Sequence, residues 1–224
     1  MFTHATFEFL DELTANNNRT WFASNKPRYE ALVREPALDF IEAMGPLLEK
    51  FAPHFRAEPR KAGGSLMRVY RDTRFSHNKI PYKTNIGIQF RHSLGKDIHA
   101  PGFYVHIAPD ECFFAVGCWH PDADALGKLR DLIASKPDKW FAARDDKKFA
   151  AHWRLWGANL IRPPRGYDAN HPAIADLKRK DYVAMAPLSI AEVTGKGLVK
   201  LAGRRFAETA PFMRFLCDAL ELQY

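Results

Sequence analysis

The sequence has no long hydrophobic run and no signal-peptide pattern in its first residues. None of its apolar stretches approaches the roughly 18 consecutive residues that a membrane-spanning helix needs. The first residues also lack a basic segment followed by an apolar one, the mark of a signal peptide. We therefore expect a soluble protein of the cytoplasm that is neither secreted nor inserted into a membrane.

Cysteine is scarce. Cys112, Cys118 and Cys217 are odd in number and include no closely spaced pair. This argues against a disulfide framework and against the paired-cysteine motifs of zinc sites. We expect three buried thiols in a reducing compartment.

Familiar catalytic and cofactor motifs are missing too. Ser76 has no Gly-x-Ser-x-Gly elbow around it, and residues 63–65 lack the Gly-Lys-Ser/Thr ending of a phosphate-binding P-loop. No His-Glu-x-x-His helix is present, and no metal site is predicted from the four histidines near the expected strands, which have no carboxylate in register: His92, His99, His106 and His120. The sequence points to no particular cofactor.

What the sequence does have is apolar material for a substantial core. Of its 224 residues, 46% are hydrophobic and 13% are aromatic. We predict a single α+β domain over residues 1–224. Its parts are a helical segment (1–60), a central sheet (61–120) and a mainly helical segment (121–224) that contains an ordered, proline-rich loop.

Helical spacing dominates the first part of the chain. Apolar residues three apart predict a helix that ends at the asparagines 16–18. Thr20 is then expected to cap a short turn, and Pro27 to occupy the first turn of the next helix. Pro36 predicts a break or kink, followed by a helix with an apolar stripe to about Phe51.

The hydrophobic period changes to two after residue 64. It predicts β-strands at residues 66–71, 85–91, 103–108 and 112–119, with a further short strand within 178–187. The short connection at 109–111 suits a hairpin, so at least that pair is antiparallel. Alternation gives the sheet one apolar and one polar face. We expect N- and C-terminal helices to cover one face of this antiparallel sheet of at least four strands.

Positive charge is concentrated in one region. The net charge is +7, and residues 61–100 carry eight Lys or Arg against two acids. Residues 1–60 carry seven against nine. Such a local excess predicts one basic face that attracts an anion.

A motif at residues 68–84 holds most of this excess. It contains five cations around Asp72, with tyrosines and Phe75 between them. Arginine offers a planar fork for phosphate or carboxylate and lysine a compact charge, so the set suits a small, phosphate-bearing anion on the polar sheet face. The predicted binding residues are Arg68, Tyr70, Arg71, Asp72, Arg74, Lys79, Tyr82, Lys83 and His106.

Three other interpretations of this motif remain open. It can be an ordinary solvated sheet face with a basic loop. It can be an internal clasp in which the arginines pair with helix carboxylates such as Glu30, Glu35 or Asp39. It can also bind nucleic acid, with cations on phosphates and tyrosines on bases, although no recognised nucleic-acid-binding motif is present.

Two further segments carry polar groups. Residues 162–172 place Arg165, Tyr167, Asp168 and His171 on a proline-stiffened loop, which a simple structural connection also explains. Residues 17–22 could form the edge of a ligand site, but helix capping and a buried Trp-Phe pair explain these residue types adequately.

Several of these motifs together resemble a known family, the one called domain of unknown function 2461. The resemblance spans nearly the whole chain and rests on Asn17-Asn18-Arg19, Trp21-Phe22, Tyr29-Glu30, residues 71–76, Lys79, Pro81-Tyr82-Lys83, Gly117, Trp119, Pro121 and residues 164–167. It implies one soluble α+β domain and brings no established activity.

Overall fold

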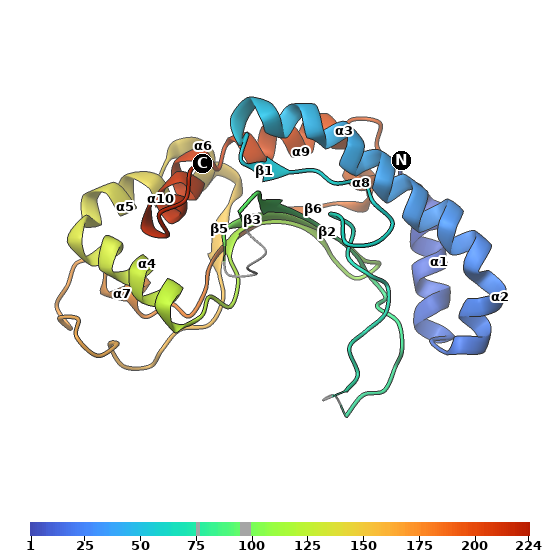
Figure 1. Cartoon of the computed structure of the whole chain (residues 1–224), viewed down its shortest axis with the longest axis horizontal. Coiled ribbons are helices and arrows are strands. Elements are labelled where there is room, and N and C mark those ends of the chain that lie inside the picture. Colours follow the sequence, from blue (N-terminus) through green and yellow to red (C-terminus); the bar gives the residue numbers. More distant parts are fainter. Residues whose placement is uncertain (75–76, 95–99) are drawn as a thin grey trace.

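A six-stranded antiparallel sheet forms the centre of the computed structural model, which describes residues 1–74, 77–94 and 100–224 (Figure 1). The strand order is β1-β2-β3-β4-β6-β5. The strands are β1 (Phe55–Arg56), β2 (Ile86–His92), β3 (Gly102–Ile107), β4 (Cys112–Cys118), β5 (Arg154–Trp156) and β6 (Tyr182–Leu188). The predicted α+β class with a mid-chain antiparallel sheet is confirmed.

Alternating patterns located most of this sheet. The strands expected at residues 85–91, 103–108 and 112–119 correspond to β2, β3 and β4, and the short one within 178–187 is β6. The expected hairpin joins β3 to β4, where the Ala108 N–H donates to the Glu111 carbonyl at 3.0 Å. β6 then pairs with β4, and β5 with β6 at the sheet edge.

The strand predicted at residues 66–71 is wrong. Leu66 bridges Ile88 of β2, but the chain then leaves the sheet, and Tyr70 bridges Tyr82 instead. Alternation of side chains is the same whichever partner the backbone finds, so the pattern could not tell these pairings apart.

The apolar face of the sheet packs against helices, as predicted. Phe90 and Phe103 are fully buried, and their rings meet Phe206 of α9 (Leu198–Ala207) at 6.3 and 5.0 Å between centroids. Phe40 of α3 (Glu35–Phe51) contacts Phe90 from the N-terminal side. Figure 1 shows α3 and α9 together on this face. Each buried ring stabilises the fold by roughly 1.5–3 kcal/mol.

The N-terminal helices follow the predicted spacing, with different caps. They are α1 (His4–Ala15), α2 (Arg19–Tyr29), a π-helical turn at Glu30–Arg34 and α3. Asn16 ends α1, as expected, but Asn18 caps α2 instead of Thr20, because its side chain accepts the Trp21 N–H at 2.9 Å. Pro27 lies inside α2 instead of in the first turn of a new helix.

Pro36 does not break the helix. Its missing N–H leaves the Leu32 carbonyl, four residues earlier, without the usual helical donor. The hydroxyl of Thr6 on α1 donates to that carbonyl at 2.9 Å. The helix therefore continues through a π turn, a common way to accommodate such a disruption.

The C-terminal part of the chain contributes helices together with β5 and β6. Trp140 is buried among the rings of Tyr182, Phe212 and Phe215, and its indole N–H donates to the buried Asp176 at 2.8 Å. The remaining helices are α4 (Ala123–Ser135), α5 (Pro137–Arg144), α6 (Lys147–His152), α7 (Ile174–Leu177), α8 (Ile190–Thr194) and α10 (Ala210–Ala219).

The cysteines match their expected state. Cys112, Cys118 and Cys217 are all buried and free of disulfides, as predicted. Within the described ranges, no helix is both long and apolar enough to cross a membrane.

Replacement of two glycines by alanine should change the stability of the fold in opposite directions. Gly117 has φ +114°, and an added Cβ would lie 2.0 Å from the Tyr182 carbonyl oxygen. We expect Gly117→Ala to destabilise the protein by about 2 kcal/mol or more. Gly127 lies in α4 with open space around it, so Gly127→Ala should stabilise by roughly 0.5–1 kcal/mol. Chemical denaturation measures both; a neutral Gly117→Ala would contradict the close approach of β4 and β6.

Candidate functional site

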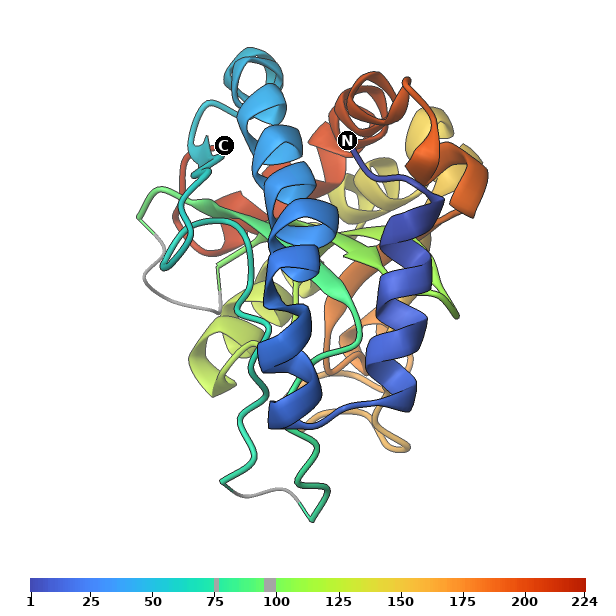
Figure 2. The same ribbon diagram turned by 90° about the vertical axis from the view of Figure 1, so that its right-hand side faces the viewer.

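The sheet face opposite α3 and α9 is flanked but not covered by helices in the described part of the chain. Figures 1 and 2 show the N-terminal helices and a long loop on one side of it and the lobe of α4, α5 and α7 on the other. Half-buried Tyr104, His106 and Phe113 lie on this face. The predicted binding motif forms the loop, so it lies beside the open face.

The motif folds back on itself as a two-stranded ribbon, which we call the basic hairpin (residues 69–74 and 77–83). Tyr70 faces Tyr82, the Arg71 N–H donates to the Pro81 carbonyl at 2.9 Å, and the Lys83 N–H donates to the Val69 carbonyl at 2.7 Å. In this register Arg71 and Lys83 are diagonal neighbours on one side of the ribbon, and the Cβ atoms of such neighbours lie somewhat less than roughly 7–8 Å apart. The register brings these two cations together.

Hydrogen bonds from the Asn17 side chain stabilise this register. Because Tyr70 and Tyr82 form a pair without mutual hydrogen bonds, the backbone polar groups of Tyr82 point away from the ribbon. The Asn17 side chain donates to the Tyr82 carbonyl and accepts the Tyr82 N–H, both at 3.1 Å. Its carboxamide thus replaces a neighbouring strand, a role that sequence reasoning missed because the two residues are 65 positions apart.

Aromatic stacking holds the same point of the hairpin. Phe22 of α2 is buried and stacks on Tyr82 at 4.0 Å between centroids with the rings 20° apart. Tyr70 contacts both rings at longer distances, yet it remains 53% exposed. The expected buried Trp-Phe pair therefore needs revision: Phe22 anchors the motif, whereas Trp21 is partly buried.

Asp72 pairs with cations of its own segment. Arg74 holds its carboxylate with two side-chain hydrogen bonds, Nε–Oδ1 at 3.0 Å and Nη2–Oδ2 at 2.7 Å, while Arg68 Nη2 lies 4.0 Å away. These bonds from Arg74 lower the pKa of Asp72 to about 2. Lys79 Nζ donates to the Thr73 carbonyl at 2.9 Å. Arg74 and Lys79 thus make bonds within the hairpin.

Arg71 and Lys83 line a pocket of ≈ 250 Å³, the basic pocket. Its wall contains no acidic residue, and in the described structure neither cation forms an ion pair with a carboxylate. The lining residues are Thr14, Asn17, Arg71, Ile80, Tyr82, Lys83, Thr84 and Asn85. Two positive charges and several neutral hydrogen-bonding groups therefore surround one opening.

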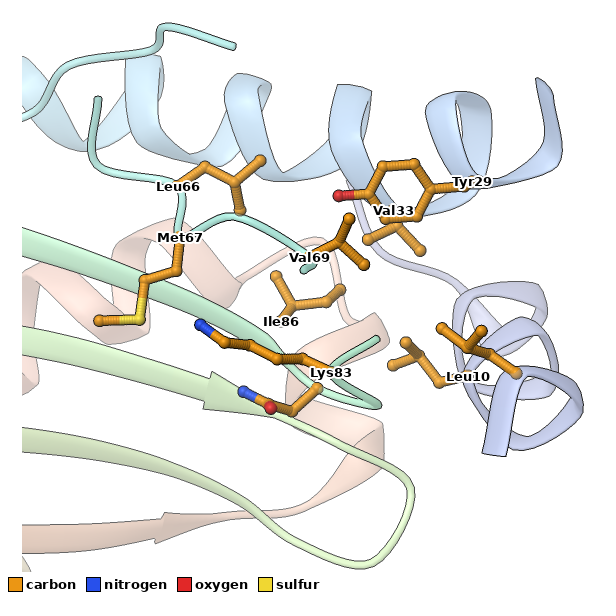
Figure 3. A pocket seen from close by; sticks show the side chains of 10 residues that line it. Leu10, Tyr29, Val33, Leu66, Met67, Val69, Lys83 and Ile86 are labelled. Atoms are coloured by element: carbon orange, nitrogen blue, oxygen red, sulfur yellow. The ribbon is translucent and has the colours of Figure 1, made fainter. Parts of the chain in front are cut away.

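Lys83 also borders a second, smaller space. Figure 3 shows its side chain running below Val69 and Ile86, with Nζ on the side of Met67. This cavity of ≈ 10 Å³ is mostly apolar. Burial lowers the pKa of Lys83, and the nearby Arg68 guanidinium lowers it further.

His106 lies on the open sheet face and does not line the basic pocket. Its Nδ1 is 3.1 Å from the Tyr104 hydroxyl, and its ring stacks on Phe113 at 4.6 Å. Burial lowers the pKa of His106, so the ring is mainly neutral at pH 7. Asn85 lines the basic pocket and contacts Tyr104, which links the pocket to this part of the face.

The clasp interpretation finds no support among the described ion pairs. Glu30 pairs with Arg34 at 2.5 Å, and Asp39 with the N-terminal amine at 3.9 Å. Asp72, a member of the motif itself, is the carboxylate that Arg68 and Arg74 approach.

The proline-rich loop makes structural bonds. Tyr167 donates to Asp131 at 2.8 Å, Asp168 accepts the Asn170 N–H at 2.9 Å, and His171 Nε2 lies 3.1 Å from the Ala134 carbonyl oxygen. In the described residues, no three His, Cys, Asp or Glu side chains gather as metal ligands. Phe75, Ser76 and His99 lie outside the described residues.

Fold and site together define an α+β protein with a six-stranded antiparallel sheet and a basic pocket at its side. The chain belongs to the family described as conserved hypothetical protein (DUF2461), whose model matches residues 5–215. The resemblance read from the sequence is thereby confirmed. No curated protein and no solved structure matches the chain.

The Asn17 contact can be tested directly. Asn17→Ala leaves the Tyr82 N–H and carbonyl without their side-chain partner, so we expect a loss of about 1–2 kcal/mol in the free energy of unfolding. Hydrogen exchange at the Tyr82 amide should accelerate at the same time. Asn170→Ala, on an exposed loop, is the matched control and should change neither quantity. Unchanged Tyr82 protection in Asn17→Ala would contradict the role given to this carboxamide.

Proposed function

We propose that this protein binds a small anionic ligand that bears a phosphate group, in the basic pocket. The observation that carries the proposal is that Arg71 and Lys83, neither paired with a carboxylate among the described residues, both line a pocket whose described wall has no acid. A phosphate between them would accept hydrogen bonds from the guanidinium fork and from the ammonium.

The neutral lining residues suit the rest of such a ligand. Thr14, Thr84 and Asn85 supply hydroxyl and amide groups, and Ile80 supplies an apolar wall. A volume of ≈ 250 Å³ is below the usual range of drug-sized sites, so it favours a compact molecule. Of the predicted binding residues, Arg71, Tyr82 and Lys83 line the basic pocket. Its wall does not include the other six, which are Arg68, Tyr70, Asp72, Arg74, Lys79 and His106.

Thermal unfolding with added phosphate and phosphorylated metabolites tests the proposal. A ligand at ten times its Kd should stabilise the wild-type protein by about 1.4 kcal/mol, which raises the Tm of a chain of this length by roughly 3–6 °C. Arg71→Ala should lose most of this shift, because it removes the fork from the pocket wall. Chloride at equal ionic strength controls for screening.

Arg74→Ala is the matched variant, since it removes the same charge from the same hairpin. Arg74 bonds with Asp72 and does not line the pocket, so its variant should keep the ligand-induced shift. Equal losses in the two variants would indicate a diffuse electrostatic effect. Absence of any stabilising anion would contradict the proposal.

Nucleic-acid binding is a second candidate, favoured by the exposed part of the hairpin. The Arg68 and Arg74 side chains are 68% and 77% exposed, and the ring of Tyr70 is accessible for stacking on a base. This candidate predicts an electrophoretic shift of single-stranded or duplex probes that weakens steeply with salt. Both arginine variants should then weaken binding, and no shift at low salt would remove the candidate.

A further inference from the structure

Lys83 combines features that distinguish a reactive amine from a surface lysine. Its side chain is half-buried between the polar basic pocket and the small apolar cavity shown in Figure 3. No carboxylate pairs with its ammonium group in the described residues. Lys79, in the same hairpin, is exposed and donates to a backbone carbonyl.

We propose that Lys83 forms an imine with the carbonyl carbon of a small phosphate-bearing aldehyde or ketone whose phosphate is held by Arg71. This inference rests on the proposed function, because it assigns the phosphate to the same pocket. It adds a covalent step and a substrate class. The diagonal placement of Arg71 and Lys83 on one side of the hairpin suits a ligand whose phosphate and carbonyl groups are a few bonds apart.

The step balances without a cofactor. The neutral amine attacks the carbonyl carbon, a C–N bond forms, and the carbonyl oxygen takes a proton to give a carbinolamine. Loss of that oxygen as water then leaves the C=N bond, so amine and carbonyl yield imine and one water molecule. The reaction needs a neutral amine, and lysines are activated in this way when they are desolvated or placed next to another cation.

Both conditions hold at Lys83. Burial lowers its pKa, as does the guanidinium of Arg68. Tyr29 and Tyr82 are the other titratable groups that line the two spaces, and burial raises the pKa of both, so they stay protonated and neutral at pH 7. The neutral fraction of Lys83 is therefore larger than that of an ordinary lysine at the same pH.

Reductive trapping tests the proposal on the full chain. The protein is incubated with glycolaldehyde phosphate and a mild borohydride, and each modified lysine is located by peptide mass spectrometry. We expect Lys83 to be labelled about fivefold faster than Lys79 or more at pH 7. Arg68→Gln should slow labelling of Lys83, because it removes the neighbouring charge. Equal labelling of Lys83 and exposed lysines overturns the proposal.

Two comparisons separate this proposal from the proposed function. Lys83→Arg keeps the positive charge but cannot form the imine, so it should lose the adduct at position 83, whereas the phosphate-induced rise in Tm is read on the wild-type protein. Phosphate-induced stabilisation without selective labelling of Lys83 overturns the imine alone.

Glycolaldehyde without phosphate should react more slowly at Lys83, and excess inorganic phosphate should protect this lysine from labelling. Equal rates with the two aldehydes overturn the substrate class, and a concurrent lack of phosphate stabilisation overturns the proposed function as well.

Discussion

The double hydrogen bond between Asn17 and the backbone of Tyr82 is the constraint on which the site depends. A two-stranded ribbon is marginally stable by itself and can slip in register. Here the Asn17 carboxamide takes the N–H and the carbonyl that an isolated ribbon would leave to water, and Phe22 stacks on the same residue. The turn between α1 and α2 therefore fixes which residues of the hairpin face each other.

The register in turn sorts the charges. One acid, Asp72, engages Arg74 and lies near Arg68, so these cations are satisfied within their own segment. Arg71 and Lys83 lie on the other side of the pairing and have no carboxylate partner in the described structure. Because a one-residue slip would exchange the two sides of the ribbon, the same sequence could pair its charges differently. The proposed anion site therefore depends on the pairing register of the basic hairpin and not on the number of its cations.

Much of the fold could be predicted from local patterns. Alternation of apolar and polar residues predicts β2, β3, β4 and β6. Helical spacing of apolar residues predicts α1, α4, α9 and α10. β1 and β5 are two and three residues long, too short to show any period. Two local differences have another origin. The helix continues at Pro36, where Thr6 bonds to the Leu32 carbonyl, and Asn18 caps α2 in place of Thr20.

The candidate site, too, could be predicted only in part from local patterns. Composition alone identified the basic segment, and alternation placed Tyr104 and His106 on the less apolar face. The division of five cations into paired and open ones depends on contacts across the hairpin and on Asn17, 65 positions from Tyr82. Such contacts leave no local signal in the sequence.

A double-mutant cycle on phosphate binding tests the central claim, that Arg71 and Lys83 act on one anion. The binding free energy is measured by calorimetry for the wild-type protein, Arg71→Ala, Lys83→Met and the double variant. Cations that share one phosphate should be coupled by about 0.5–3 kcal/mol. Additive losses within about 0.3 kcal/mol would mean independent sites and would contradict the account.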